Sequence, residues 1–416
     1  MTVLDMIYNA GFSAYLHGFD AIDSWLSQKN HDNTVKILTN AGTADLARLF
    51  EELRYPGVDL ADAALDDNEK TWYFRCADTL NDNYTFCPAD LHASFNLLEF
   101  YMDCNSRGSP TAHSGAGTIA RSGSVFYDPR GIYPQLLDIR RNLFKTVEVK
   151  LNPLQIFREG INKGFTNTCY LMDAALILAK YFPVDSGAQC YVKEITEILN
   201  NNYESRSPGQ EEQRILLCSL ITSPNPGLGL ELLKTSGFIS RFWPELAVLE
   251  QADHSKEFHP EGNAWNHTME TFRYRKSNSC DLRLSLGLLL HDIGKPFAVS
   301  TGSHRYDGHA ELGETQARRF LERLGFNSSI THDICFLVRN HMLPAAIPRL
   351  PLFRTAQIMT SPLFPLLMEL YRCDESSSFK GLDNYYESSA AYQSFLKNRR
   401  NPYRSADGKK LNRNQK

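Results

Sequence analysis

An adjacent histidine and aspartate, His291 and Asp292, directly follow an apolar run at residues 286–290. Gly294 and Pro296 come next, and both are typical of the end of a helix. An imidazole and a carboxylate at the end of a buried helix need partners, because burying them alone costs free energy. A divalent metal ion is a suitable partner for both groups. The pair therefore predicts a metal site, provided that further ligands are present elsewhere in the chain.

Four more residues of metal-ligand type lie at the start or end of predicted helices: His267, His309, His341 and Asp374. The helices of a bundle can bring such ends together in one cavity. With His291 and Asp292 they supply ligands for two divalent ions, such as Mn, Fe, Co, Ni or Mg, with Asp292 between the ions. Such ions bind phosphate oxygens and lower the pKa of a bound water. The set predicts phosphoester hydrolysis with Asp292 and Lys295 as catalytic residues, the lysine neutralising charge on the phosphoryl group.

A purely structural role is the alternative for each of these residues. His291 and Asp292 could form a buried hydrogen-bonded pair, and Lys295 could be a surface lysine. One ion could also be held without His309 and His341. The other histidines considered are predicted to lie at the surface or behind the ligands: His254, His259, His304 and His332.

The elements that must position these residues predict an α+β chain that begins with a small α/β domain at residues 1–130. The signals within that domain are β-prone runs and one helical pattern: 13–17, 35–39 and 72–76 for strands, and 45–53 for the helix. Residues 105–123 are rich in Ser, Gly and Thr, which predicts a loop.

Helical periodicity dominates the rest of the chain. Residues 131–250 predict an all-α neck, and residues 251–396 predict an all-α domain that contains the metal ligands. Residues 397–416 hold eight Lys or Arg and one acid, which predicts a disordered basic tail. Contact with RNA through this tail is the functional alternative.

The composition is that of an ordinary soluble globular protein, with 42% hydrophobic and 22% charged residues among 416. The net charge of −4 does not favour nucleic acid, so RNA binding would need a local patch. Nine scattered cysteines without a CxxC pair are typical of a reduced, intracellular chain. The first residues lack a basic signal-peptide region, and no apolar run reaches the roughly 18–20 residues that span a bilayer. We expect a cytoplasmic protein without a membrane partner; the oligomeric state is left open.

Four motifs resemble the HD domain of bacterial tRNA nucleotidyltransferases, the CCA-adding and poly(A) polymerase-like family: HPEGNAWNHT (259–268), HDIGKP (291–296), GHAELG (308–313) and VRNHM (338–342). Asn263 and Asn266 stand where this family usually has acidic residues. The resemblance implies the same six metal ligands: His267, His291, Asp292 and Asp374 as in HD phosphohydrolases generally, and His309 and His341 as in their binuclear branch. It also implies hydrolysis of phosphomonoesters, 2′-nucleotides or 2′,3′-cyclic phosphates.

The resemblance continues upstream, but with key residues replaced. In AYLHGFDAID, Phe19 takes the place of a family glycine that lets backbone amides approach a triphosphate. The family's two metal-binding aspartates fall at Thr34 and Lys36, and its third carboxylate falls near Lys70. Asp32 is an alternative equivalent if the register shifts. Hydroxyl and ammonium groups cannot hold the Mg²⁺ ions of nucleotidyl transfer, so the comparison implies an inactive transferase half that serves as a scaffold.

Three functions follow as hypotheses. The first is a metal-dependent HD phosphohydrolase or phosphodiesterase acting on nucleotide or RNA-terminal phosphoesters, with transferase activity unlikely. The second is a nucleotidyltransferase that adds CCA or poly(A) to RNA 3′ ends. The third is a non-catalytic protein that binds RNA or nucleotides.

Overall fold

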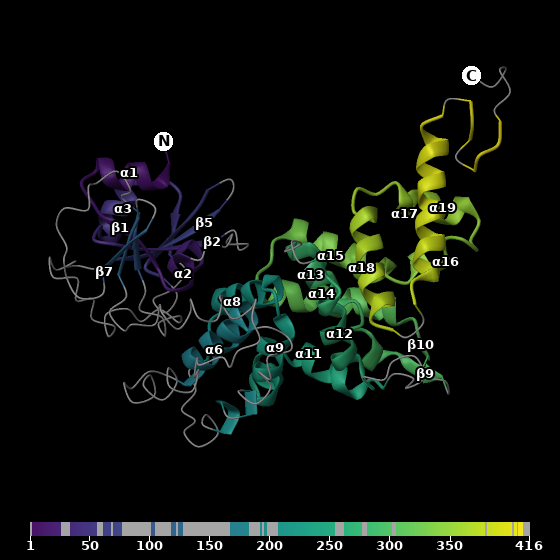
Figure 1. Ribbon diagram of the computed structural model, residues 1–416, viewed down its shortest axis with the longest axis horizontal. Helices are drawn as coiled ribbons and strands as arrows, with labels where there is room; N and C mark the ends of the chain where they lie inside the picture. Colours follow the sequence, from purple (N-terminus) through teal and green to yellow (C-terminus); the bar gives the residue numbers. More distant parts are fainter. Residues whose placement is uncertain are drawn as a thin grey trace. The chain divides into compact units, whose positions relative to one another are not determined.

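The computed structural model describes the chain in these segments: 2–25, 34–55, 61–76 without 68–69, 101–104, 118–127 without 122–123, 167–182, 192–197 without 194, 207–253, 262–276, 281–301, 305–378, and 381–410 without 402 and 406. The chain divides into two compact units, Met1–Ser236 and Gly237–Lys416, each described by itself (Figure 1). The first unit contains the main sheet and the second is mostly helical, which confirms the predicted α+β class. The boundaries at 130, 250 and 396 stay predictions.

An eight-stranded sheet lies in the first unit, in the strand order β3-β4-β5-β2-β1-β6-β8-β7. The strands are β1 (Ala14–His17), β2 (Thr34–Thr39), β3 (Leu53–Arg54), β4 (Ala63–Asp66), β5 (Thr71–Cys76), β6 (Tyr101–Asp103), β7 (Thr118–Arg121) and β8 (Ser124–Tyr127). β2 and β5 are parallel, and the other neighbouring strands are antiparallel. The three strands predicted from β-prone runs are β1, β2 and β5.

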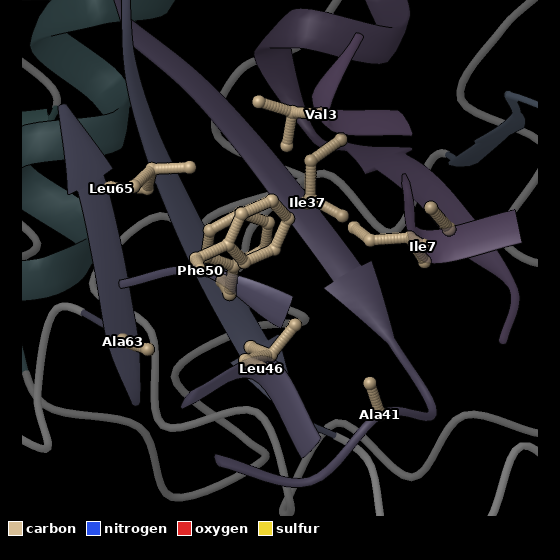
Figure 2. Close-up of a cluster of buried hydrophobic side chains, with 10 residues drawn as sticks. Val3, Ile7, Ile37, Ala41, Leu46, Phe50, Ala63 and Leu65 are labelled. Carbon is tan, nitrogen blue, oxygen red and sulfur yellow. The ribbon is translucent and has the colours of Figure 1, made fainter. Parts of the chain in front are cut away.

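Three short helices accompany these strands: α1 (Val3–Asn9), α2 (Phe19–Trp25) and α3 (Thr43–Leu49). Side chains from α1, α3 and the strands form one apolar core, shown in Figure 2. In this core the rings of Phe50 and Phe74 stack with their centroids 6.0 Å apart, and Ile37 of β2 is 1% exposed. Burying a side chain of this size stabilises the fold by roughly 1.5–3 kcal/mol, so packing against α1 and α3 holds β2 and β5 in place.

The described helices that follow the sheet in the first unit include α6 (Asn167–Tyr181), α8 (Gln210–Thr222) and α9 (Pro226–Thr235), at the positions that the helical patterns predict. α9 crosses α6 closely at Gly229. A Cβ atom added there would lie 2.5 Å from the carbonyl oxygen of Ala175, a separation that side chains do not adopt. The glycine therefore sets the distance between the two helices.

The second unit is built around α13 (Leu282–Leu290), which packs against α12, α15 and α18. Its other helices are α10 (Phe238–Phe242), α11 (Pro244–Ala247), α12 (Ala264–Arg273), α14 (His309–Arg323), α15 (Ser328–Asn340), α16 (Leu343–Ala346), α17 (Leu352–Met359), α18 (Phe364–Ser376) and α19 (Asp383–Arg399), with 3-10 turns η1 (Val248–Gln251) and η2 (Lys295–Phe297). At Gly287 an added Cβ would lie 2.9 Å from Leu370 and 3.1 Å from Leu337. This close packing explains why α13 is buried on every side from Leu284 to Leu290.

Three sequence predictions need correction. The predicted loop at 105–123 contains strand β7, because β-branched residues there pair with β8. The predicted helix at 45–53 ends at Leu49, since Phe50 is extended with φ −129° and turns into the core. The helical second unit also contains a two-stranded sheet, β9 (Val299–Thr301) with β10 (Arg305–Asp307). Strand pairing depends on a partner distant in the chain, which local patterns do not contain.

The prediction of a disordered tail at 397–416 is wrong for its described part. α19 continues to Arg399, and residues beyond it form a turn closed by a bridge between Arg404 and Lys410. The backbone N–H of Ser405 donates to the carbonyl of Lys409 at 2.9 Å, and Gly408 takes the left-handed φ of 84° that this turn requires. Local hydrogen bonds thus order a segment that has almost no apolar residues.

Among the described residues no helix is long and apolar enough to cross a membrane. The first part of the predicted all-α neck, residues 131–166, lies outside the described residues, as do Asp32, His254, His259 and His304.

Candidate metal centre

The His291–Asp292 pair lies at the buried end of α13. Asp281 caps the start of this helix, accepting hydrogen bonds from the backbone N–H groups of Arg283 and Leu284, and His291 is the residue that ends it. The two side chains are only 1% and 2% exposed, respectively. The apolar helix therefore carries a titratable pair into the interior of the second unit.

The other four candidate residues come from helices that meet at this point. His267 lies within α12, His309 is the first residue of α14, His341 ends α15, and Asp374 lies in the last turn of α18. Asn263 begins α12 by accepting a hydrogen bond from the N–H of Asn266 at 2.9 Å. In this chain the asparagine therefore fixes the start of the helix that carries His267.

The first half of the cluster surrounds one carboxylate oxygen of Asp292. His291 Nε2 lies 3.3 Å and His267 Nε2 lies 4.0 Å from Asp292 Oδ2. His267 Nε2 also lies 2.9 Å from Asp374 Oδ1. One ligand atom from each of His267, His291 and Asp292 lies within 4.8 Å of the others, which is compact enough for a single ion.

The second half of the cluster surrounds the other oxygen of Asp292. His309 Nε2 and His341 Nε2 lie 3.8 Å and 3.9 Å from Asp292 Oδ1. These three residues also meet the 4.8 Å limit for a shared ion. Asp292 is thus the member common to both halves, and its predicted role between two ions stays a prediction.

Backbone carbonyls fix which nitrogen of three imidazoles carries the proton. The Nδ1 atoms of His291, His309 and His341 lie 2.8, 2.6 and 2.7 Å from carbonyl oxygens, which can only accept hydrogen bonds. The acceptors are three residues upstream in each case: Leu288, Tyr306 and Val338. Each Nδ1 therefore donates, and in the neutral form of these imidazoles each Nε2 has a lone pair directed at the cluster, as in metal-binding histidines.

The lone pairs that result call for a cation. His309 Nε2 and His341 Nε2 lie 3.0 Å apart, and two acceptor atoms at that distance repel each other unless a cation lies beside them. His291 Nε2 is buried and makes no hydrogen bond among the described residues, which costs free energy if it stays unmatched. The donor set and its orientation therefore fit a divalent metal ion.

Burial and neighbouring groups also hold two members in the protonation state that a metal needs. Burial, together with the nearby His291 and His309, lowers the pKa of His341 to about 4 against the opposing effect of Asp292. Burial acts to raise the pKa of Asp374, but the hydrogen bond and charge of His267 outweigh it and hold that pKa well below its usual range. Neutral imidazole and ionised carboxylate are the ligand forms of these groups.

Lys295 lies against Asp292 instead of pointing away from the cluster. Its Nζ is 2.6 Å from Asp292 Oδ2, and its side chain is 16% exposed. The preceding Gly294 allows this approach: an added Cβ would lie 2.0 Å from the carbonyl oxygen of His309 and 2.4 Å from the N–H of Gly313. A glycine is therefore required where η2 meets α14, and the sequence signal for it is the HDIGKP motif.

The first unit presents a different arrangement at the positions of the expected transferase metal site. Thr34 begins β2, and Lys36 donates its backbone N–H to Asp20 Oδ2 at 2.8 Å. Burial raises the pKa of Asp20 to about 6, although Lys36 and Lys180 lower it in part. Asp23, which is 4% exposed, lies 3.0 Å from Lys180 Nζ and accepts a hydrogen bond from the Tyr181 hydroxyl at 2.9 Å.

Within the described part of the first unit, no group of three His, Cys, Asp or Glu side chains is close enough to hold a metal ion. The Lys180 ammonium pairs with the buried Asp23 instead. These residues do not fit the pair of Mg²⁺ ions implied by the resemblance, and we derive no step through such ions. Asp32 lies outside the described residues.

Comparison with known proteins finds similarity to one domain family and to several curated proteins. Residues 264–374 match the HD domain family. The CC-adding tRNA nucleotidyltransferase of Thermus thermophilus is 33% identical over 141 residues, which are 32% of this chain and 32% of the relative. The multifunctional CCA protein of Halorhodospira halophila is 34% identical over 122 residues, or 29% of each chain. The matches thus span about a third of the length of these curated relatives.

A solved CCA-adding enzyme in complex with ATP overlaps 95% of this chain and 81% of its own, with a TM-score of 0.40 and 12% identity. Overlap this loose carries no functional conclusion. The two curated relatives bear on one expectation directly: one is named a CC-adding tRNA nucleotidyltransferase and the other a multifunctional CCA protein, and neither is named for HD hydrolysis. The hypothesis of an HD phosphohydrolase as the principal function is therefore wrong, and the judgement that transferase activity is unlikely has no support from them.

Proposed function

Since the chain is related to tRNA nucleotidyltransferases that carry an HD domain, we propose that it acts at the 3′ end of tRNA as a nucleotidyltransferase. The observation that carries the proposal is the kinship with CC-adding and CCA-adding proteins, whose identity to this chain exceeds 30% in the matched regions. The sheet of the first unit supports it. There β1 leads through Gly18 into α2, and β2 lies between β1 and its parallel neighbour β5.

The partners under this proposal are a tRNA 3′ end and a nucleoside triphosphate. The carboxylates for transfer would include residues outside the described segments, with Asp32 as the first candidate. Purified full-length protein should extend a tRNA transcript that lacks its terminal CCA when labelled CTP, ATP and Mg²⁺ are supplied. Asp32→Ala should abolish the extension, whereas Asp67→Ala, an exposed acid next to β4, should leave it unchanged. No extension by the wild-type protein would contradict the proposal.

The HD cluster has a separate role in this proposal, as a site for divalent metal. His267, His291, Asp292 and Asp374 would hold one ion, and Asp292, His309 and His341 would hold a second. Mn, Fe, Co, Ni and Mg are the candidates. A divalent ion supplies positive charge that binds phosphate oxygens; the protein residues orient the imidazoles and keep them neutral. Metal analysis of the purified protein tests the site independently of nucleotide addition.

A second candidate function is binding of a tRNA end without catalysis. One observation favours it: Thr34 and Lys36 occupy the expected metal-ligand positions, and Lys180 and Tyr181 engage Asp23. The two functions are separated by the same reaction, because a binder would retain the tRNA transcript and incorporate no label.

A further inference from the structure

Positive charge is concentrated at one end of this acidic protein. Residues 397–416 carry a net charge of +7, with eight Lys or Arg and one acid, Asp407. Since the whole chain has a net charge of −4, residues 1–396 carry −11. In the described part of this segment Lys397, Arg399, Arg400, Arg404, Lys409 and Lys410 are all exposed. Such segregation produces a strong local field on a molecule whose overall charge repels anions.

The basic residues continue one exposed stripe of α19. Ser388, Tyr392 and Phe395 lie on one side of this helix; Ser388 and Phe395 are buried, and Tyr392 packs against Phe364 with ring centroids 4.5 Å apart. The opposite side is exposed at spacings of three and four residues: Tyr386, Ala390, Gln393, Lys397 and Arg400. Residues at this spacing lie on one face of a helix. The stripe therefore faces solvent along its whole length and becomes basic at its C-terminal half.

Most of the basic side chains at the end of α19 and in the turn after it are not paired with an acid in the part of the chain that the structure describes. Arg404 Nη1 donates to the carbonyl oxygen of Gly408 at 3.1 Å, and Lys409 pairs with Asp407 at 3.2 Å. Lys397, Arg399, Arg400 and Lys410 have no acidic partner among the described residues. A Cβ added to Gly408 would lie 3.0 Å from Asn398 Nδ2, so the turn folds back on the end of the helix.

An aromatic side chain lies between these charges. Tyr403 follows Arg400 by three residues, precedes Arg404 and is 69% exposed. An exposed tyrosine among arginines offers a face on which a nucleobase can stack, with phosphates bound by the neighbouring cations. An ordered helix end that combines a basic stripe with an aromatic face suits RNA better than it suits a lipid surface, which needs a broad apolar face.

We propose that the C-terminal half of α19 and the turn to Lys410, the 393–410 element, is a preformed RNA-binding surface in which Lys397 and Arg400 contact phosphates and Tyr403 stacks on an unpaired base. This inference deepens the proposed action on tRNA and holds for both candidate functions. The RNA contact considered from the sequence was a disordered basic tail; the surface proposed here is a helix face with one exposed aromatic side chain.

The test measures binding of the full-length protein to an unmodified tRNA transcript by fluorescence anisotropy over a series of KCl concentrations. Lys397→Gln/Arg400→Gln should weaken binding at least about tenfold and reduce the slope of log affinity against log salt by about 1.5, because two phosphate contacts are lost. Arg48→Gln/Arg319→Gln removes the same charge from exposed positions elsewhere and should change affinity much less.

Tyr403→Ala should weaken binding roughly 5- to 100-fold with little change in the salt slope, since stacking releases no counterions. Tyr403→Phe should restore binding, and Tyr386→Ala, an equally exposed tyrosine at the acidic end of α19, should have no effect. Equal binding by the Lys397/Arg400 pair and its control pair would overturn the proposal. Binding to anionic phosphatidylserine vesicles that needs the same residues, without RNA binding, would also overturn it.

These results are independent of catalysis. If wild-type protein binds tRNA through the 393–410 element but adds no nucleotide, the transferase proposal is wrong and the proposed RNA-binding surface is supported. If the Lys397/Arg400 variant adds nucleotides at an unchanged rate at limiting tRNA, the proposed RNA-binding surface is wrong and the transferase proposal is supported.

Discussion

The two units of this protein place buried carboxylates in opposite surroundings. In the second unit, imidazoles from α12, α13, α14 and α15 surround Asp292, and three of them have Nδ1 committed to a carbonyl, leaving Nε2 as a lone pair. In the first unit, Asp23 is met by the Lys180 ammonium and the Tyr181 hydroxyl, which already carry the hydrogens that the carboxylate accepts. Imidazole nitrogens therefore make up most of the surroundings of Asp292, whereas N–H and O–H donors make up those of Asp23.

This difference shows why a carboxylate by itself does not identify a metal site. A buried anion must be compensated, and either a lysine or a metal ion can do so. The neighbouring donor atoms decide between them, because lone pairs facing one another accept a cation whereas N–H and O–H groups exclude it. Asp292 combines the two cases: Lys295 Nζ lies 2.6 Å from its Oδ2, and the Nε2 atoms of three histidines lie 3.3 to 3.9 Å from its two oxygens.

The strongest test of the comparison is to remove the shared ligand of the second unit. Asp292→Asn should reduce bound Mn²⁺ from two ions per chain to none after dialysis, because both halves of the cluster use this carboxylate. Loss of a direct ligand should exceed the roughly 10- to 100-fold effect of changing a group behind the ligands. Mass-spectrometric metal analysis and calorimetric titration measure it. Asp333→Asn, which disrupts an ion pair with Arg283 in the same unit, is the matched control and should retain both ions.

The lysine of the first unit offers the converse test. Lys180→Met leaves Asp23 buried beside Tyr181 without its ammonium partner, since the lysine and aspartate side chains are 13% and 5% exposed. Removing one member of a buried ion pair should lower the free energy of unfolding by about 3 kcal/mol. Arg48→Met removes an exposed helical pair with Asp45 and should cost about 0–1 kcal/mol. Urea unfolding compares the two, and equal effects would mean that Asp23 does not depend on Lys180.

The sequence identified all six members of the cluster that the structure brings together, because each ends, begins or lies on an apolar helix and the HDIGKP motif is distinctive. The groups that orient the imidazoles were not predicted. They are backbone carbonyls of Leu288, Tyr306 and Val338. Every residue has a backbone carbonyl, so the residue type gives no sign of this role. Their regular place three residues before each histidine is a signal that could be used, since a residue that ends or begins a helix can reach back by that distance.

Fold predictions were correct for most helical and β-prone runs, but they missed elements that local patterns do not mark. The periodicity of α6 and α15 was sufficient, whereas β7 depends on pairing with β8 and the turn after Arg399 depends on hydrogen bonds between polar groups. The main function was wrong for another reason. An intact constellation of ligands shows that a site can exist, but it does not show that this site performs the principal reaction of a chain with two units.

A smaller effect distinguishes the two halves of the cluster. His309→Asn should remove the ion held with His341 and leave the ion at His267 and His291, so that bound Mn²⁺ falls from two ions to one. His341→Asn should do the same. His332→Asn changes an exposed histidine on α15 and should keep both ions. Loss of both ions from His309→Asn would mean that the halves form one site, which would leave Asp292 no bridging role.

The smallest expected effect concerns Asp20, whose folded-state pKa of about 6 lies above the ordinary value of an aspartate. A raised pKa means that the folded state binds the proton more tightly, so this group's stabilisation is complete below the unfolded pKa and is lost as pH rises through about 6. Asp20→Asn keeps an oxygen that can accept from the Lys36 N–H but cannot ionise. The variant should match the wild type near pH 4 and exceed its stability at pH 8 by up to about 2 kcal/mol. The difference in unfolding free energy between wild type and variant could instead be the same at both pH values. That result would show that Lys36 and Lys180 already compensate the ionised carboxylate of Asp20, as Lys180 does for Asp23.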